Sequence, residues 1–386
     1  MGLVLLVTDR DLRIVGDPIT SWRSLEAVPR FNEVGTGAVV VEATPQVRAQ
    51  LAPGNRMVLI RDHSVFLSGP IEVDNLEWSV DGDTAGDGLV RITWASDLAA
   101  VAGRVTYPNP AVAATAQDEG KRSFSSVNAE TILRTLVDEN AGPGALAARR
   151  VPRLILGDVA GVGSDVTYST RFQPLADELR AVATIGGDLG FRTRQVADEI
   201  LFEVYEPQNL SSQIRFSPQW GNLQEFAFDR AAPRVTTAIV GGEDADENRV
   251  IRERTDTAAE AAWGRIEQFI DRRSYEEVAE LDEAGDEALA DGGETARLAA
   301  VTVDTARQRF GEHYDLGDVV AVALGHGAQV ADVVRAVHLQ HTPDSGEVIT
   351  AMVGSRSASA DPEWIRQSRR LARQLARAAT AGEIAL

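Results

Sequence analysis

The side chains that could do chemistry in this chain of 386 residues follow no common catalytic or metal-binding pattern. Cysteine is absent, which excludes thiol catalysis, Cys-ligated zinc and disulfides. His338 and His341 lie three residues apart in a strand-like run, so their side chains should point to opposite faces. No Glu follows His338, as the two-histidine zinc helix requires. The sequence therefore predicts no metal site.

Two loops resemble ligand-binding loops only in part. The acidic loop 81–88 would need a ligand at position 85 and a Glu at position 92 to bind calcium as an EF-hand, but these are Ala85 and Ile92. The glycine-rich segment 157–163 leads into a strand, so it lacks the helix N-terminus of a phosphate-binding loop. The acidic loop is interpreted as a solvated hairpin tip and the glycine-rich segment is not interpreted as a phosphate-binding loop, so we expect no catalytic residue and no cofactor.

Acidic residues dominate the charge of the chain. Asp and Glu number 58 against 38 Lys and Arg, which gives a net charge of −20 spread along the whole sequence. This balance disfavours nucleic-acid binding by the chain as a whole and favours solubility. The start of the chain has no basic segment or cleavage site, and no apolar run is long enough to span a membrane. We expect synthesis in the host cytoplasm and no membrane insertion.

The elements that would position these side chains are mostly short strands rich in Val, Ile and Leu. The first hundred residues predict an antiparallel barrel or sandwich, and strands return after about residue 211. Between them, helices are predicted at 128–140 and 174–186, followed by a hairpin at 191–205. A further helix begins at the capping-box pair Ser274 and Glu277.

The predicted fold class is mainly β with an α+β insertion. Two barrel-like tube domains flank a smaller α+β domain, and a C-terminal helix follows. The expected bounds are 1–103 for the first β-barrel domain, 104–206 for the insertion, 207–354 for the second barrel with a crossing helix, and 355–386 for the C-terminal helix.

A weak internal repeat appears when Gly54 is aligned with Gly317. Each stretch has a Gly-Asx turn, a strand, a tight polar turn carrying His63 or His326, and a second strand. One interpretation is that all hairpins of this length look alike. The other is that the chain contains two copies of one barrel, one on each side of the insertion. Three such chains could then match a sixfold ring.

The C-terminal helix, opened by Asp361-Pro362, has two distinct faces. Apolar residues form one stripe, and arginines fall within an arc of about 100° on the other side. The helix either docks on its own domain or meets a neighbouring subunit. For the second case the predicted interface residues are Ile365, Leu371, Leu375, Arg366, Arg369, Arg370, Arg373 and Arg377.

In the order and spacing of several short segments, the sequence resembles the tail-tip hub proteins of long-tailed phages of high-GC Gram-positive hosts. These are minor tail proteins similar to baseplate hubs and to tail-associated lysins. The segments that carry the resemblance are Arg30–Gly35, Leu51–Gly54, Leu67–Ile71, Phe202–Tyr205, Arg215–Pro218, Gly221–Leu223 and Tyr314–Val319.

The resemblance implies a virion protein of the tail tip that forms a homotrimeric ring continuing the tail lumen. Its implied partners are the hexameric distal tail protein, the tape-measure protein and downstream tip or receptor-binding proteins, with DNA only as passing cargo. Many relatives carry a C-terminal cell-wall hydrolase, but this chain reaches Leu386 after one helix, so we expect no enzyme activity.

Two other functions stay open at this point. The first is a β-rich cell-wall or polysaccharide hydrolase, which should show convergent titratable groups. The second is a carbohydrate-binding module of a tail tip, which should show exposed aromatic residues, whereas aromatics make up only 6% of this chain.

The C-terminal helix gives the first testable prediction. Deletion of residues 361–386 should leave the melting transition unchanged while assembly into tails fails. The stripe through Ile365, Leu371 and Leu375 would bury on a partner, at about 1.5–3 kcal/mol for each side chain. Calorimetry of the truncated chain tests this, and a much earlier transition would place the helix in the core.

Overall fold

The computed structural model describes residues 2–77, 88–117, 120–242, 249–272, 278–293 and 295–354. The chain divides into two compact units, one made of Met1–Glu225 and Ala300–Leu386, the other of Phe226–Ala299. No helix in these described ranges is long and apolar enough to cross a membrane. The predicted class, mainly β with α+β parts, is confirmed.

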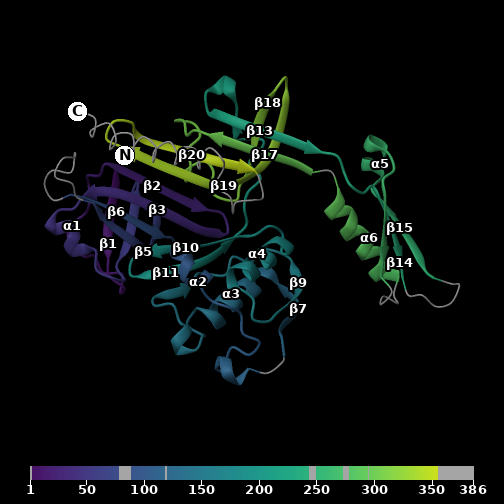
Figure 1. The fold of residues 1–386 in the computed structure, drawn as a ribbon, viewed down its shortest axis with the longest axis horizontal. Helices are drawn as coiled ribbons and strands as arrows, with labels where there is room; N and C mark the ends of the chain where they lie inside the picture. Colours follow the sequence, from purple (N-terminus) through teal and green to yellow (C-terminus); the bar gives the residue numbers. More distant parts are fainter. Residues whose placement is uncertain are drawn as a thin grey trace, which may run out of the picture. The chain divides into compact units, whose positions relative to one another are not determined.

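A twelve-stranded sheet is the main element of the fold (Figure 1). Ten strands follow the order β1-β4-β5-β6-β3-β2-β19-β20-β17-β13, and β12 and β18 pair beside β19. The strands are β1 (Leu3–Thr8), β2 (Ser24–Arg30), β3 (Glu33–Glu42), β4 (Arg56–Arg61), β5 (Ser64–Glu77), β6 (Leu89–Ala95), β12 (Arg215–Phe216), β13 (Leu223–Ala231), β17 (Thr295–Thr302), β18 (Val319–Gly325), β19 (Ala328–Thr342) and β20 (Gly346–Gly354).

The sheet consists of two halves with the same strand order. The first half runs β4-β5-β6-β3-β2 and the second runs β18-β19-β20-β17-β13. Val58 pairs with Ser68 in the first hairpin and Ala321 with Ala331 in the second, so both partners shift by 263 residues. Because this is the offset between Gly54 and Gly317, the predicted repeat is confirmed in the register of the strands.

The repeat extends to the third strand of each half. The pairing of β5 with β6 shifts register between Ile71 and Val73, and that of β19 with β20 shifts between Val334 and Ala336. These two irregularities lie at equivalent positions. A bulge re-aims the strand that carries it, so both halves bend at the same place.

The turn before each hairpin is also repeated. The N–H of Ile71 donates to the carbonyl of Asn55 at 3.0 Å, and the N–H of Val334 donates to that of Asp318 at 2.9 Å. At the hairpin tips, His63 and His326 both have positive φ, as predicted for turn positions. Shared turn contacts and shared register make the two halves copies of one structural plan.

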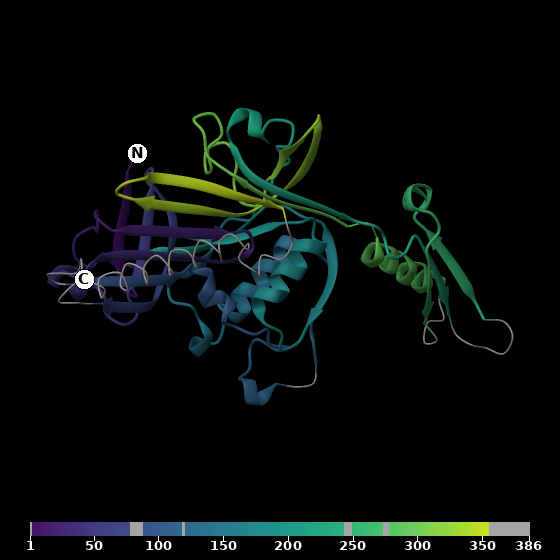
Figure 2. The same cartoon turned by 45° about the horizontal axis from the view of Figure 1, so that its top comes forward.

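The two halves are joined edge to edge, and this corrects the expectation of two barrels. Strand β19 pairs with β2 across the halves, from Ala336 opposite Arg30 to His341 opposite Leu25. Figure 2 shows the yellow-green strands β19 and β20 running beside purple strands of the first half. Among the described residues the strand order ends at β1 and β13, so the sheet is not a closed barrel. The outer edge of β2 pairs with β19 of the second half, so it does not close a barrel within the first half.

The α+β insertion contains two helices, as predicted. Asn128 caps α3 (Ala129–Asn140), α4 (Leu175–Ile185) packs beside it, and both bury their apolar faces against the hairpin β10–β11. Its other elements are β7 (Arg122–Asn128), β8 (Leu154–Leu156), β9 (Asp165–Thr170), β10 (Gly190–Val196), β11 (Glu199–Tyr205) and the 3₁₀ turns Ala114–Ala116 and Ala147–Arg149. Outside the insertion lie the short helices α1 (Pro45–Gln50) and α2 (Leu98–Ala102) and the 3₁₀ turn Pro218–Trp220.

Between β13 and β17, the elements of the second unit form a small sheet of their own and do not join the second half of the large sheet. β14 (Thr237–Gly241) lies between β15 (Ile251–Thr255) and β16 (Glu267–Asp271), and α6 (Val278–Gly292) packs on this sheet, while α5 (Thr257–Trp263) connects two of its strands. The strands predicted at 236–240 and 266–270 therefore exist but belong to their own small sheet. Paired bidentate contacts from Arg252 to Asp282 and from Arg254 to Asp286 hold α6 against β15. The capping-box pair Ser274 and Glu277 lies outside the described residues.

Two glycines at the ends of β18 give a matched stability test. Gly317 and Gly325 have φ of +91° and +95°, so alanine is strained at both. A Cβ at Gly317 would also lie 2.4 Å from Cε2 of Phe31, whereas at Gly325 nothing lies within 4 Å. We expect Gly325→Ala to lower the free energy of unfolding by about 1 kcal/mol and Gly317→Ala by about 1–3 kcal/mol more. Urea denaturation followed by circular dichroism measures both, and equal losses would contradict the close approach of Phe31.

Candidate functional site

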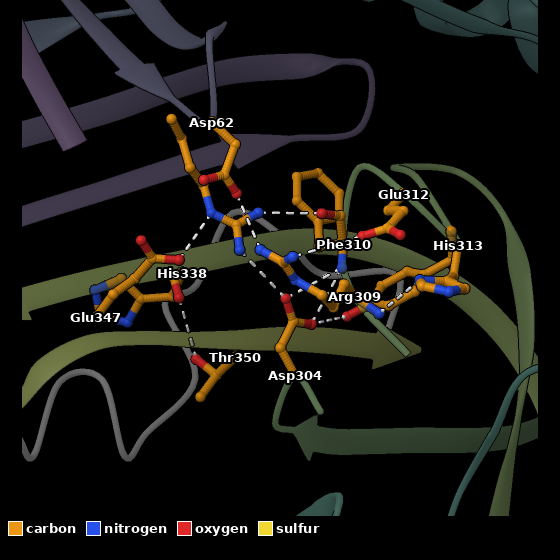
Figure 3. Close-up of polar contacts among 11 residues, drawn as sticks. Asp62, Asp304, Arg309, Phe310, Glu312, His313, His338, Glu347 and Thr350 are labelled. Carbon is orange, nitrogen blue, oxygen red and sulfur yellow. Dashed lines mark hydrogen bonds and ion pairs between the residues drawn. The ribbon is translucent and has the colours of Figure 1, made fainter. Parts of the chain in front are cut away.

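A partly buried cluster of charged side chains links the first half of the sheet to the second (Figure 3). Arg61 ends strand β4, and Asp62 follows it in the tip of the β4–β5 hairpin. Asp304 and Arg309 come from the loop that precedes β18, and Glu347 lies at the start of β20. The cluster therefore joins segments more than two hundred residues apart in the chain.

Arg61 is the centre of the cluster. Its side chain is only 9% exposed, and its Nε donates to Oε1 of Glu347 at 2.8 Å. Nη1 donates to the carbonyl of Phe310 at 3.1 Å, and Nη2 lies 3.7 Å from Oδ2 of Asp304. A planar guanidinium can serve several acceptors at once, so one side chain of the first half binds three groups of the second.

Asp304 is held by donors as well as by charge. The hydroxyl of Tyr314 donates to Oδ1 at 2.9 Å, and the N–H of Phe310 donates to the same carboxylate. Burial raises the pKa of Asp304, against the opposing effect of these hydrogen bonds and of Arg61. Burial also raises the pKa of Tyr314 well above its ordinary value, which keeps the hydroxyl protonated as a donor. The carboxylate of Asp304 is thus engaged in contacts that hold neighbouring segments together.

A second arginine makes the reciprocal contact. Nη2 of Arg309 donates to Oδ2 of Asp62 at 2.9 Å, and Nη1 lies 3.5 Å from Glu312. Arg61 reaches from the first half to acids of the second, and Arg309 reaches from the second half to an acid of the first. The cluster of Arg61, Asp62, Asp304, Arg309 and Glu347 is called the clasp below.

A cleft of about 800 Å³ adjoins the clasp and is bounded by the β4–β5 hairpin, strand β10 and the loop before β18. Arg192 on its wall donates to Glu203 and to Asp315, both at 2.6 Å, and so ties the α+β insertion to the second half. Arg61, Arg192 and Arg309, which line the cleft, each make an ion pair with an acid of another segment. These contacts can hold the β4–β5 hairpin, the α+β insertion and the loop before β18 in one fixed geometry.

The glycine-rich segment 157–163 binds a side chain of the protein itself. The N–H groups of Ala160, Gly161 and Val162 donate to the carboxylate of Glu130 at 2.8, 2.6 and 3.0 Å. Glu130 is fully buried in the first turn of α3. The backbone donors that could have held a phosphate are occupied by the chain's own carboxylate.

The residues singled out from the sequence do not come together in one site. His341 Nδ1 accepts a hydrogen bond from Trp22 at 2.9 Å, and His338 lies buried on the same strand. In the part of the chain that the structure describes, no three His, Asp or Glu side chains group so as to hold a metal ion. Outside the described residues lie Ile365, Arg366, Arg369, Arg370, Leu371, Arg373, Leu375 and Arg377.

The clasp itself was missed in the sequence. In the sequence, Arg61 and Asp62 have the pattern of a strand end followed by a turn, and Asp304 is one of 58 acidic residues, so nothing marks them as partners. The Gly54 and Gly317 repeat gave no signal for it, because the counterpart of Asp304 at the same offset is Val41 in β3 and not a residue of the β4–β5 hairpin.

The chain matches one protein family and has a fold similar to those of several solved structures. The family described as Siphovirus ReqiPepy6 Gp37-like protein matches residues 4–355 of the chain. No curated protein sequence matches the chain. A solved structure with a similar fold is the 43 kDa tail protein of prophage MuSo2 from Shewanella oneidensis, with a TM-score of 0.56 and 9% identity over 92% of this chain and 97% of that one.

Two further solved structures are similar. The tail protein from Neisseria meningitidis MC58 has a TM-score of 0.55 and 11% identity, over 92% of this chain and 97% of that one. Prophage tail protein gp18 from Listeria monocytogenes EGD-e has a TM-score of 0.52 and 12% identity, over 96% and 99%. At these identities the likeness concerns the fold, and together with the family it supports a structural protein of a phage tail.

The clasp gives a prediction with a matched control. Arg61→Met should lower the free energy of unfolding by about 1–3 kcal/mol, because it removes the hydrogen bond and ion pair that Arg61 makes with the largely buried Glu347 and Asp304. Arg23→Met removes the exposed pair with Glu42, whose side chains are 53% and 68% exposed, and should cost less than about 1 kcal/mol. Denaturant unfolding compares the two, and similar small losses would show that the clasp adds no stability.

Proposed function

The chain belongs to the Siphovirus ReqiPepy6 Gp37-like family, and on that basis we propose that it is a hub protein in the tail tip of a long-tailed phage. Three copies form a ring that continues the tail lumen. The ring connects the hexameric distal tail protein to tip and receptor-binding proteins, and the tape-measure protein is a further partner. The host is a high-GC Gram-positive bacterium.

The observation that carries this proposal is the repeated register of the two half-sheets. A chain with two similar halves presents two similar surfaces to a neighbouring ring. Three such chains present six, which matches a sixfold neighbour where three single domains would not. The duplication thus provides a physical reason for a threefold ring in a sixfold tail.

The clasp supports the same arrangement. Two halves of one chain can occupy adjacent places in a ring only if the angle between them is fixed. The pairing of β19 with β2 sets that angle, and Arg61 and Arg309 hold it from both sides. A rigid joint of this kind suits a protein whose task is to keep a channel open.

Charge and domain order complete the proposal. The net charge of −20 would let exiting DNA slide past an acidic lumen without binding.

Segments 1–103 and 207–354 supply the two tube-forming halves, 104–206 the inserted domain and 355–386 the docking helix, with Phe226–Ala299 as a compact unit within the second segment. The role is structural and requires no cofactor, and the protein is made in the host cytoplasm before it joins the virion.

Copy number in purified virions tests the proposal. Isotope-dilution mass spectrometry should find one copy of this chain for every two of the distal tail protein, because three subunits meet six. Immunogold labelling should place the chain at the tip of the tail. A one-to-one ratio, or a single copy in each particle, would contradict the threefold ring.

A further inference from the structure

A turn of the α+β insertion holds an aromatic side chain at the surface in a strained backbone conformation. Phe172 has a φ of +52° and is 41% exposed. A positive φ is uncommon for a bulky residue and persists only where the surroundings enforce it. Thr106 enforces it here, because its carbonyl accepts the N–H of Phe172 at 2.9 Å and its N–H donates to the carbonyl of Gln173 at 2.9 Å. The fold thus fixes an apolar ring where water reaches it.

Arginine side chains gather around this ring. Cζ of Arg171 lies 5.9 Å from the centroid of the Phe172 ring. The ring of Tyr107 lies 5.9 Å from that of Phe172, and Cζ of Arg149 lies 3.6 Å from the centroid of Tyr107. Arg104 donates through Nε to the carbonyl of Arg149 at 2.9 Å. Three guanidinium groups and two aromatic rings therefore lie in one place.

These three arginines have no acidic partner among the described residues. Nη1 of Arg149 donates to Oδ1 of Asn140 at 3.1 Å and Nη2 to the carbonyl of Val105, which are both uncharged. Burial lowers the pKa of Arg149 and, against the opposing effect of Tyr107, the charge of Arg104 lowers it further. The arginines of the clasp, by contrast, each face a carboxylate. In a chain of net charge −20, this positive charge is not compensated by the described residues.

Together these groups have the composition of a surface that binds protein. Val105 is 41% exposed, so a second apolar side chain lies beside the cations. Tyrosine and arginine are enriched where proteins bind each other, and guanidinium groups bind carboxylates through paired hydrogen bonds. An acidic protein segment would bring a few carboxylates with apolar side chains between them, whereas the rest of this acidic chain would repel a long polyanion such as DNA. The basic patch, as we call it below, consists of Arg104, Val105, Tyr107, Arg149, Arg171 and Phe172.

We infer that the basic patch binds an acidic segment of the tip protein that follows the ring in the tail. The inference rests on the proposed function and adds a contact surface for one of its partners. The half-sheet occurs twice in each chain and gives six similar surfaces in a ring, whereas the α+β insertion occurs once among the described residues. Three chains thus offer three basic patches, which suits a partner present in three copies.

Photocrosslinking in assembled tails tests the inference, with p-benzoylphenylalanine in place of Phe172 as the probe. After irradiation of purified virions, mass spectrometry should find one tip protein linked through a segment rich in Asp and Glu, and present in the same copy number as this chain. The control places the same probe at Val159, which is 67% exposed and lies beside the first turn of α3, whereas the basic patch contacts Asn140 at its last turn. The control should not give this product.

Charge reversal shows whether the arginines make the contact. Arg171→Glu should abolish the product without shifting the melting transition of the purified chain, because Arg171 is exposed and its side chain donates no hydrogen bond to a described group. Arg171→Lys should keep the product. Arg153→Glu makes the same change of charge in an exposed pair with Asp198 and should leave the product unchanged. Tails that lack the tip protein, with an unchanged melting transition, would equally support the contact, whereas an earlier transition would make Arg171 part of the fold and contradict it.

The other possible occupants give different products. A link to a second copy of this chain, a nuclease-sensitive link to DNA, or no link at all would show that the inference is wrong, as would a product that Arg171→Glu leaves unchanged. The threefold ring would still stand after any of these results if virions hold one copy of this chain for every two of the distal tail protein. The expected product with a different ratio would uphold the contact at the basic patch and overturn the ring.

Discussion

The pairing of β19 with β2 is the contact on which the rest of the structure depends. Each half of the sheet has the same strands in the same register, but without this pairing they would be two separate sheets on one chain. Strand pairing fixes direction, spacing and register together, since a slip of one residue would turn every side chain to the opposite face. The clasp adds charged contacts from loops beside the joint, so the angle between the halves is set by both backbone and side chains.

Local features of this fold could be predicted from the sequence because short-range rules govern them. Asn128 caps α3 where a polar residue precedes an apolar stripe, and the hairpin tips at His63 and His326 follow from polar turns between strands. The Gly54 and Gly317 alignment predicted a duplication because both glycines open the same turn with nearly equal positive φ.

Long-range features were not accessible in the same way. Whether the strands at 236–240 and 266–270 join the large sheet depends on which edges they meet, and their apolar pattern fits either sheet. The clasp needs Arg61 beside Glu347 and Asp304, a proximity created by the joint between the halves rather than by spacing. The Glu130 contact likewise appears only once α3 and the glycine-rich segment are folded together.

The structure presents a chain with two half-sheets of the same register, joined by one edge contact between β19 and β2. A duplicated sheet with one fixed joint suits the structural task that we propose. A reconstruction of the virion's tail tip by electron cryo-microscopy tests this claim most directly. The account predicts three chains whose six half-sheets surround the lumen. A tip with one or six copies, or with half-sheets that do not surround the lumen, would contradict it.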